Sequence, residues 1–424
     1  MAQLEQGSRR SPAAPARLPA RPPARLPARA KSRLSFRHAL CWSLAAIVPA
    51  VGAYAAEWSA ESSASLTGKF DDNIRLSSTN EQSVFGAIFA PYLNVSRRSP
   101  IWDMSFKADL SIARYTEDSN LDTEDPRLRA DVRYRTQLGL LRVQGEASRA
   151  STLVTEEADT GNFTTTTQRN LFRVAPSWSY AVTEIDTISV GAGWTEVNYE
   201  SGALNDYRSL AANTGWARQV TQADVVSLNL SGNHFVSDSV VELQSNSVTA
   251  LANWEHTFSD RLTASAGAGP QYFVTDVLVP GGGLQTDEES SFGYSLNAGV
   301  DYQLSDLTAL GASFERQIEP TSSGSPLQRN RFTVSANHRF LPRLSGSLRA
   351  FFQQDSNPTN DSTASRDRDF FSIEPRVTWA VGQDWDLTGS YRFRTQSTDT
   401  ADRAYSNAVF VTVTYRPESW TFGH

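Results

Sequence analysis

Three arginines in one short stretch of the sequence could bind anions together. Arg129, Arg133 and Arg135 are spaced by four and two residues, so in an extended strand their side chains point to the same face. Their guanidinium groups would lie within about 14 Å of one another along the strand. Guanidinium groups are planar and bind carboxylate, sulfate or phosphate by paired hydrogen bonds. Because only Asp131 interrupts the run and Arg142 is expected to join it across a short turn, the pattern predicts a positively charged surface.

Other stretches with the same alternation carry more cations on the corresponding face. If the strands enclose a lumen, its wall is basic although the whole chain has a net charge of -7. Two interpretations are open. The arginines either form a corridor that favours anions, because a charged passage focuses the potential on what passes through it, or they pair with lumenal acids and brace the wall. The residues predicted to line the lumen and set its selectivity are Arg129, Arg133, Arg135, Arg142, Arg173, Arg331, Arg349, Arg376, Arg392 and Arg394.

Catalytic chemistry has little support in the sequence. Beyond the N-terminal segment and the last residue, the histidines are His234, His256 and His338, on three separate expected strands. No nucleophile elbow, zinc-ligand spacing or phosphate-binding loop is present. The paired acids Asp71–Asp72 and Glu288–Glu289 are interpreted as solvated loop charges. We predict no catalytic residue, no metal site and no cofactor, with a barrel enzyme such as an outer-membrane phospholipase or protease as the alternative.

The elements that must position these side chains are long amphipathic strands. From Ser291 to Leu304, SFGYSLNAGVDYQL, apolar and polar residues alternate over fourteen residues, which is the period of a strand. Phe292, Tyr294 and Leu296 lie on the apolar face. The stretch is longer than a usual strand of a soluble protein and long enough for a tilted strand that crosses a bilayer.

Repeated along the chain, this pattern predicts an all-β protein. We expect a closed antiparallel transmembrane β-barrel of about eighteen strands, with short periplasmic turns and long extracellular loops. Closure follows from the surroundings, because an open sheet edge in hydrocarbon would leave backbone groups unpaired. A water-soluble β-sandwich or propeller is the alternative, but it would show shorter strands and evenly spaced turns.

The N-terminal residues are expected to lie outside the barrel. Residues 1–30 alternate Arg, Pro and Ala and are predicted to be disordered, and residues 31–55 have the regions of a signal peptide cleaved before Ala56, with a membrane anchor as the alternative. Residues 1–55 hold 9 of the 39 basic and 1 of the 46 acidic residues, which leaves 30 against 45 and a net charge of -15. The one cysteine, Cys41, lies in the signal, which excludes a disulfide framework.

The barrel is expected to span residues 56–417, followed by a tail at residues 418–424. Its last strand is predicted at Ala408–Tyr415, where valines alternate on one face and Tyr415 ends the strand. This ending resembles the C-terminal signal that the barrel-assembly machinery reads. Pro417 argues against a strand ladder that continues into the tail, because proline donates no backbone hydrogen bond.

The stretch Phe70–Ser77, FDDNIRLS, followed by the series of strands, resembles the family called putative β-barrel porin 2. The resemblance covers residues 58–415 and implies a barrel of about eighteen strands. It also implies that the barrel is the outer-membrane exit for exopolysaccharide, beside a periplasmic polysaccharide-export protein, and it supplies no catalytic residue. The expected location is the outer membrane of a Gram-negative bacterium. Outer-membrane lipid, lipopolysaccharide and the barrel-assembly machinery are expected partners there, and nucleic acid is not.

Two functions remain open on the sequence: an exopolysaccharide-export channel, and a general diffusion porin for small, preferably anionic solutes. A path for sugars favours aromatic stacking surfaces in the lumen, for which Phe273 and Phe351 have the inward parity. A general porin favours a constriction loop folded into the lumen. The best candidate for that loop is the glycine-rich segment Pro280–Ser290.

Overall fold

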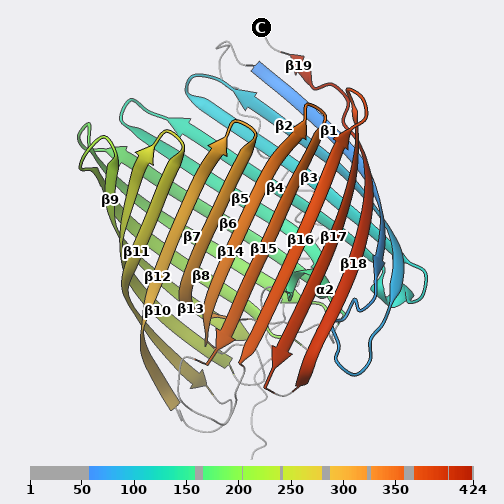
Figure 1. Ribbon diagram of the computed structural model, residues 1–424. Helices are drawn as coiled ribbons and strands as arrows, with labels where there is room; N and C mark the ends of the chain where they lie inside the picture. The colour runs from blue at the N-terminus through green and yellow to red at the C-terminus, as the bar shows by residue number, and fades with distance from the viewer. Residues whose placement is uncertain are drawn as a thin grey trace, which may run out of the picture. The chain divides into compact units, whose positions relative to one another are not determined.

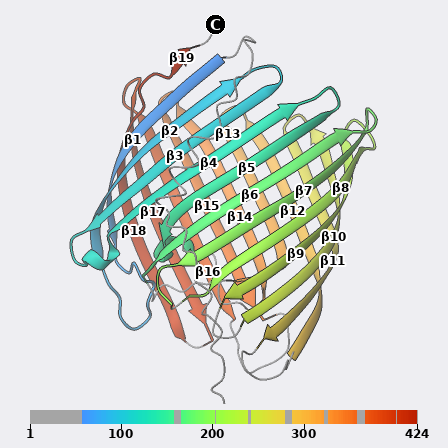
Figure 2. The same cartoon turned by 180° about the vertical axis from the view of Figure 1, so that it is seen from behind.

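The structure, a computed structural model, describes residues 57–157, 166–202, 204–238, 242–278, 287–321, 326–357, 367–399 and 401–422. These residues form one antiparallel sheet that closes on itself (Figures 1 and 2). Consecutive strands pair from β1 to β18, and β18 pairs back with β1, which confirms the predicted closed barrel of eighteen strands. The strands are β1 (Glu57–Asp71), β2 (Val84–Arg98), β3 (Trp102–Tyr115), β4 (Thr123–Arg135), β5 (Gly139–Ser151), β6 (Gln168–Ala181), β7 (Asp186–Tyr199), β8 (Asp206–Gln219), β9 (Asp224–Asp238), β10 (Glu242–Ser259), β11 (Leu262–Leu278), β12 (Asp287–Ser305), β13 (Thr308–Pro320), β14 (Pro326–Leu341), β15 (Leu344–Ser356), β16 (Arg368–Ala380), β17 (Trp385–Thr398) and β18 (Ala401–Tyr415), with a short β19 (Trp420–Phe422). Two short helices lie between strands, η1 (Ser119–Leu121) and α2 (Thr152–Thr155).

The barrel strands are 13 to 19 residues long, whereas a tilted strand needs about 9 to 11 residues to cross a bilayer. They therefore continue past the membrane. Turns as short as Asp260–Arg261 and Pro342–Arg343 connect them at one end, which lies at the top of Figure 1 together with β19. We call this the short-turn end and the opposite end the long-loop end. No helix among the described residues has the length and apolar character needed to span a membrane.

Large apolar side chains on the strands point away from the lumen. Phe292 is 76% exposed and Tyr294 is 49% exposed on the outer face of β12, with Leu296 on the same parity. The predicted direction of this strand's apolar face is therefore confirmed. Apolar side chains that are buried from solvent form small clusters instead of one core, such as the cluster of Ile74, Val84 and Leu121 beside the ends of β1 and β2.

The C-terminal end of the barrel differs from the prediction. β18 begins at Ala401, seven residues before the predicted start at Ala408. Within the predicted tail, Trp420–Phe422 form β19, which pairs with β1 and places Phe422 opposite Trp58. The reason is the length of β1. Tyr415 pairs with Ala64, so β18 leaves the first residues of β1 without a neighbour on that side, and β19 covers part of this edge.

The loop predicted as a constriction, Pro280–Ser290, lies mostly outside the described residues. Its last residues, from Asp287 on, belong to β12.

Candidate permeation site

A cationic cavity of about 480 Å³ lies on the lumen wall formed by β2 to β6. Its charged lining comprises five cations and three acids, so the count favours positive charge. The cations come from β2, β3, β4 and β6 because strand alternation brings every second residue to the lumen. The cations are Arg98, Lys107, Arg129, Arg133 and Arg173, and the acids are Asp103, Asp131 and Glu146.

Each arginine of the predicted cluster on β4 and β5 has a carboxylate partner on the wall. The pairs are Arg129 Nη2 with Asp109 Oδ2 at 2.8 Å, Arg133 Nε with Asp131 Oδ1 at 2.9 Å, Arg135 Nη2 with Asp103 Oδ2 at 3.8 Å, and Arg142 with Asp131. The expectation that too few acids lie nearby to neutralise this run is therefore wrong, because β3 supplies two partners across the ladder. The four arginine side chains are 35% to 58% exposed, and exposed pairs contribute only about 0 to 1 kcal/mol, so they remain open to competition from a passing anion.

The chain after β5 turns toward the lumen and forms a strap, which we define as Thr152–Glu157. Ser151 caps its helical turn α2, because the Ser151 side chain accepts a hydrogen bond from the backbone N–H of Leu153. Glu156 is fully buried and accepts a hydrogen bond of 2.9 Å from the Tyr199 hydroxyl of β7. The strap is therefore anchored to its own side of the barrel by polar contacts.

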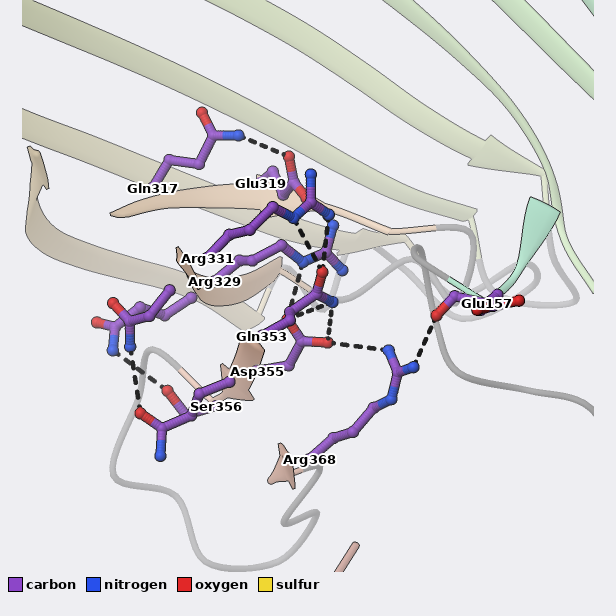
Figure 3. Close-up of polar contacts among 12 residues, drawn as sticks. Glu157, Gln317, Glu319, Arg329, Arg331, Gln353, Asp355, Ser356 and Arg368 are labelled. Atoms are coloured by element: carbon purple, nitrogen blue, oxygen red, sulfur yellow. Dashed lines mark hydrogen bonds and ion pairs between the residues drawn. The ribbon is translucent and has the colours of Figure 1, made fainter. Parts of the chain in front are cut away.

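Glu157 joins the strap to strands on another part of the wall. Its carboxylate Oε2 lies 3.1 Å from Arg394 Nη1 of β17, and its backbone oxygen accepts a hydrogen bond of 2.7 Å from Arg368 Nη2 of β16. Figure 3 shows the contact between Glu157 and Arg368. Along the wall, β4, β3, β2, β1 and β18 separate β5 from β17. A chain segment that follows β5 and contacts β17 directly must cross the lumen, so the strap narrows it.

The strap contacts a buried ionic network on β13 to β16, shown in Figure 3. Asp355 is 1% exposed and accepts from Arg329 Nε at 2.8 Å, Arg368 Nη1 at 3.3 Å and Gln353 Nε2 at 2.8 Å. Arg329 also pairs with Glu319 of β13. Most of these charged groups are buried and bonded to one another. The network therefore fixes the position of the Arg368 guanidinium group, which donates a hydrogen bond to the strap.

A second buried cluster forms around Asp71 at the end of β1. The Asp71 carboxylate, 0% exposed, lies 3.1 Å from Lys69 Nζ and 3.1 Å from Arg394 Nη2, and it accepts a hydrogen bond of 2.9 Å from the Ser406 hydroxyl. The interpretation of Asp71 as a solvated loop charge is therefore wrong. Asp72 accepts hydrogen bonds from the backbone and the side chain of Asn407. The side chains of Glu288 and Glu289 lie outside the described part of the structure.

The rest of the FDDNIRLS stretch folds the loop after β1 back on the barrel. The Asn73 amide donates to the backbone oxygens of Ser77 at 2.7 Å and Tyr405 at 2.9 Å, and Phe70 packs on Phe85 with ring centroids 4.7 Å apart. Leu76 has a φ of 46°, in the left-handed region, and its buried side chain packs with Phe370. The motif thus closes the long-loop end of the seam between β1 and β18.

Outside the strands, Asp118 braces two loops at the long-loop end. Its carboxylate accepts a hydrogen bond of 3.0 Å from the backbone N–H of Asn120 and one of 3.3 Å from the Gln82 amide, and it lies 3.8 Å from Arg75 Nη2. The Asn120 N–H and the Gln82 amide, together with the Arg75 charge, hold the pKa of Asp118 below its ordinary value. Arg75 also donates to Thr166, just before β6.

The structure separates the ten predicted lumen arginines into different environments. Arg394 is buried between Asp71 and Glu157, whereas Arg392 lies over the lumenal ring of Phe410 at 5.2 Å and Lys69 lies 5.8 Å from the same ring. The other eight are not brought into one cluster. Arg129, Arg133 and Arg173 line the cavity, and Arg135 and Arg142 pair with two of its acids, Asp103 and Asp131. Arg331 donates to Gln353, Arg349 lies on β15 opposite Glu374, and Arg376 pairs with Glu374.

Of the two aromatic residues proposed as sugar-stacking surfaces, Phe273 is buried and Phe351 is partly buried. Phe273 is 2% exposed, and Phe351 packs on Phe370 with ring centroids 5.3 Å apart. Sequence reasoning missed Glu157 as a site residue. The partners of Glu157 are 211 and 237 residues away in the sequence, and no local pattern marks such a contact. In the described part of the chain, no three His, Cys, Asp or Glu side chains gather as metal ligands.

Comparisons with known proteins find similar solved structures and one family model. A crystal structure of OpdO from Pseudomonas aeruginosa aligns with 13% identity and a TM-score of 0.45, over 85% of this chain and 98% of that one. A crystal structure of OccAB2 from Acinetobacter baumannii aligns with 10% identity and a TM-score of 0.45, over 86% and 98%. A search of curated proteins gives no match. Residues 289–417 match the family model described as putative beta-barrel porin 2, which confirms the resemblance over that range. Together with the closed barrel, this match supports an outer-membrane β-barrel channel.

Proposed function

We propose that this channel is a diffusion porin for small, preferably anionic solutes. The observation that carries the proposal is the strap, which crosses the lumen from β5 and is held by Glu157 on Arg394 and Arg368. A passage divided by a tethered segment admits small solutes more readily than a continuous polymer. The anion preference rests on the cavity on β2 to β6, where five cations face three acids.

Export of exopolysaccharide is the second candidate, because it is the function implied by the family whose model matches residues 289–417. It has less support from the lumen. A sugar polymer that moves along a wall needs open aromatic faces or an unobstructed path, but Phe273 is buried, Phe351 is packed against Phe370, and the strap occupies part of the width. In this second case a periplasmic polysaccharide-export protein would be the partner. In both cases we propose insertion by the barrel-assembly machinery into a membrane of lipid and lipopolysaccharide.

The reversal potential of the purified protein in a planar bilayer under a potassium chloride gradient tests the ion preference. We expect a preference for chloride over potassium. In parallel, the swelling of proteoliposomes in sugars of increasing size measures the width of the passage. A wild-type protein without anion preference that admits long dextrans would contradict the porin proposal and favour polymer export.

Variants of one acid test the strap. Glu157→Ala removes the carboxylate contact with Arg394, so we expect a higher single-channel conductance and entry of larger sugars. The matched control is Glu124→Ala, because Glu124 also lies near the long-loop end and pairs with an arginine, Arg114, but its side chain is 66% exposed and does not contact the strap. Equal conductance for Glu157→Ala, Glu124→Ala and wild type would show that the strap does not limit the passage.

A further inference from the structure

One arc of the lumen wall is uncharged. In β7, β8 and β9, all of whose residues the structure describes, every charged residue has the outward parity, shared with the exposed side chains of Ile188, Leu210 and Leu228. Charged inward residues occur on β4 to β6 on one side. On the other side they occur on β10 and β12, where Glu255 and Asp301 have the inward parity, and on β13 to β17. The lumen therefore presents a neutral polar face between two charged faces.

A series of inward asparagines, which we call the amide belt, begins on the neutral face with Asn213 of β8 and Asn229 of β9. It continues beyond that face with Asn253 of β10 and Asn297 of β12. Three of them are connected. Asn297 Nδ2 donates to Asn253 Oδ1 at 3.0 Å, Asn253 Nδ2 donates to Ser227 Oγ at 3.4 Å, and Asn229 Nδ2 donates to the same hydroxyl at 3.3 Å. These three amides thus form a connected row, which does not include Asn213.

Glycine makes the closest contact of the belt possible. Gly267 of β11 lies opposite both Asn253 and Asn297 in the strand register. A Cβ atom at this position would lie 2.1 Å from Asn253 Oδ1 and 2.7 Å from Asn297 Oδ1, which is closer than atoms can approach. The two amides meet across β11 because its residue at that point has no side chain.

The belt retains hydrogen-bonding capacity toward the lumen. A primary amide has two donor hydrogens and an acceptor oxygen, and each connected amide of the belt donates only one of its hydrogens to the protein. Asn213 makes no side-chain hydrogen bond within the described part of the chain, and it is exposed on the inner face of β8. Donors and acceptors on a neutral wall suit solutes with several hydroxyl groups, because each hydroxyl can both donate and accept.

The strand register connects the belt to the cationic wall. Arg142 of β5 lies opposite Ser177 of β6, and Ser177 lies opposite Gly191 of β7. Gly191 in turn lies opposite Asn213 of β8. Adjacent strands lie about 4.8 Å apart, so about 14 Å of wall separates the cation from the amide, with only small residues between them. A sugar-sized solute together with the two side chains can bridge this distance.

We propose that the preferred solutes are hydroxylated carboxylates, the chemical class of the sugar acids. The carboxylate is attracted by the arginines of β4 to β6, and the hydroxyl groups exchange hydrogen bonds with the amide belt. This inference rests on the proposed function, since it names the class of anion that the porin admits. Each belt contact is weak and partly exposed, so the solute is retained briefly and released, as passage requires.

Block of single-channel current in potassium chloride tests the inference with three probes. Gluconate has a charge and hydroxyl groups, hexanoate has the charge and six carbons without hydroxyl groups, and sorbitol has hydroxyl groups without the charge. We expect gluconate to reduce the current at a concentration about fivefold or more below that of hexanoate, because a neutral hydrogen bond contributes roughly a fivefold difference in affinity. Sorbitol should be the weakest of the three.

Variants test whether the amide belt causes the difference in block between gluconate and hexanoate. Asn253→Ala combined with Asn297→Ala should remove the advantage of gluconate over hexanoate. Gly267→Ala should weaken it without removing an amide, because the new methyl group displaces both side chains. The matched control is Asn246→Ala on the same strand β10, since Asn246 contacts His234 on the outward parity and should leave the block unchanged.

The outcomes separate this inference from the proposed function. If the channel prefers chloride but gluconate and hexanoate block equally, or the double variant keeps the wild-type advantage of gluconate, the belt does not select solutes and the porin proposal stands. If the channel shows no anion preference at all, the proposed function fails first. Migration of unheated samples in detergent gels, which differs between folded and unfolded barrels, shows that each variant has assembled.

Discussion

Arg394 and Asp71 form a buried ion pair, with Nη2 and Oδ2 3.1 Å apart, although 323 residues separate them in the sequence. Arg394 lies on β17 and Asp71 on β1, and Ser406 of the intervening strand β18 bonds to both. The pair therefore spans the seam where the first and last strands of the barrel meet. Because Arg394 also holds Glu157, closure of the barrel and attachment of the strap share one guanidinium group.

We predict that Asp71→Asn destabilises the barrel strongly. The substitution removes the carboxylate but leaves Lys69 and Arg394 buried, and breaking a buried pair in this way costs about 3 to 5 kcal/mol. Urea unfolding in lipid bilayers measures the change. The control is Glu374→Gln, because Arg376, its partner, is 53% exposed and such a pair contributes about 1 kcal/mol or less. A similar loss for both variants would show that the seam pair has no special role.

The lipid-facing wall gives a second prediction. Leu296→Arg places a charge on the outer face of β12, and such a substitution near the middle of the bilayer costs about 2 to 4 kcal/mol. Ser295→Arg is the matched control, since Ser295 is the neighbouring residue on the inner face and its new side chain would meet water. The same unfolding measurement compares the two. An equal cost would mean that Leu296 does not face lipid.

The barrel could be predicted from the sequence because its rule is local. Alternation from Ser291 to Leu304 is visible in fourteen consecutive residues, and a membrane allows such a strand only in a closed sheet. The same rule placed Arg129 and Arg133 on the inner face, and the structure puts both in the cavity wall.

What could not be predicted depends on register and on contacts across the lumen. The partner of Arg129, Asp109, lies 20 residues earlier on β3, and which acid meets which arginine depends on how two strands are aligned. The amide belt has the same origin, because Asn253 and Asn297 meet only when Gly267 lies between them. The strap crosses the lumen because Glu157 contacts Arg394, and no local sequence pattern connects these two residues.

The mature protein is expected to begin at Ala56. The basic, apolar and small-residue regions before it have the order of a cleaved secretory signal. N-terminal sequencing of the protein purified from outer-membrane fractions tests this directly. Detection of the Arg, Pro and Ala tract of residues 1–30 in that fraction would contradict the prediction.

The final prediction concerns the arginines of β4. Replacing Arg129, Arg133 and Arg135 together with Gln should lower the preference for chloride over potassium in planar bilayers. The substitutions remove three positive charges from the wall and leave Asp109 and Asp103 without these partners, while Arg142 still pairs with Asp131. In the cavity lining, five cations against three acids become three against three. Replacement of the same three residues with Lys is the control, because it retains the charge and should retain most of the selectivity. Assembly should be preserved in both variants, since these exposed pairs contribute little to stability. If the Gln variant assembles and conducts with unchanged ion selectivity, the arginines only brace the wall, and the preference for anions must come from other cations of the lumen.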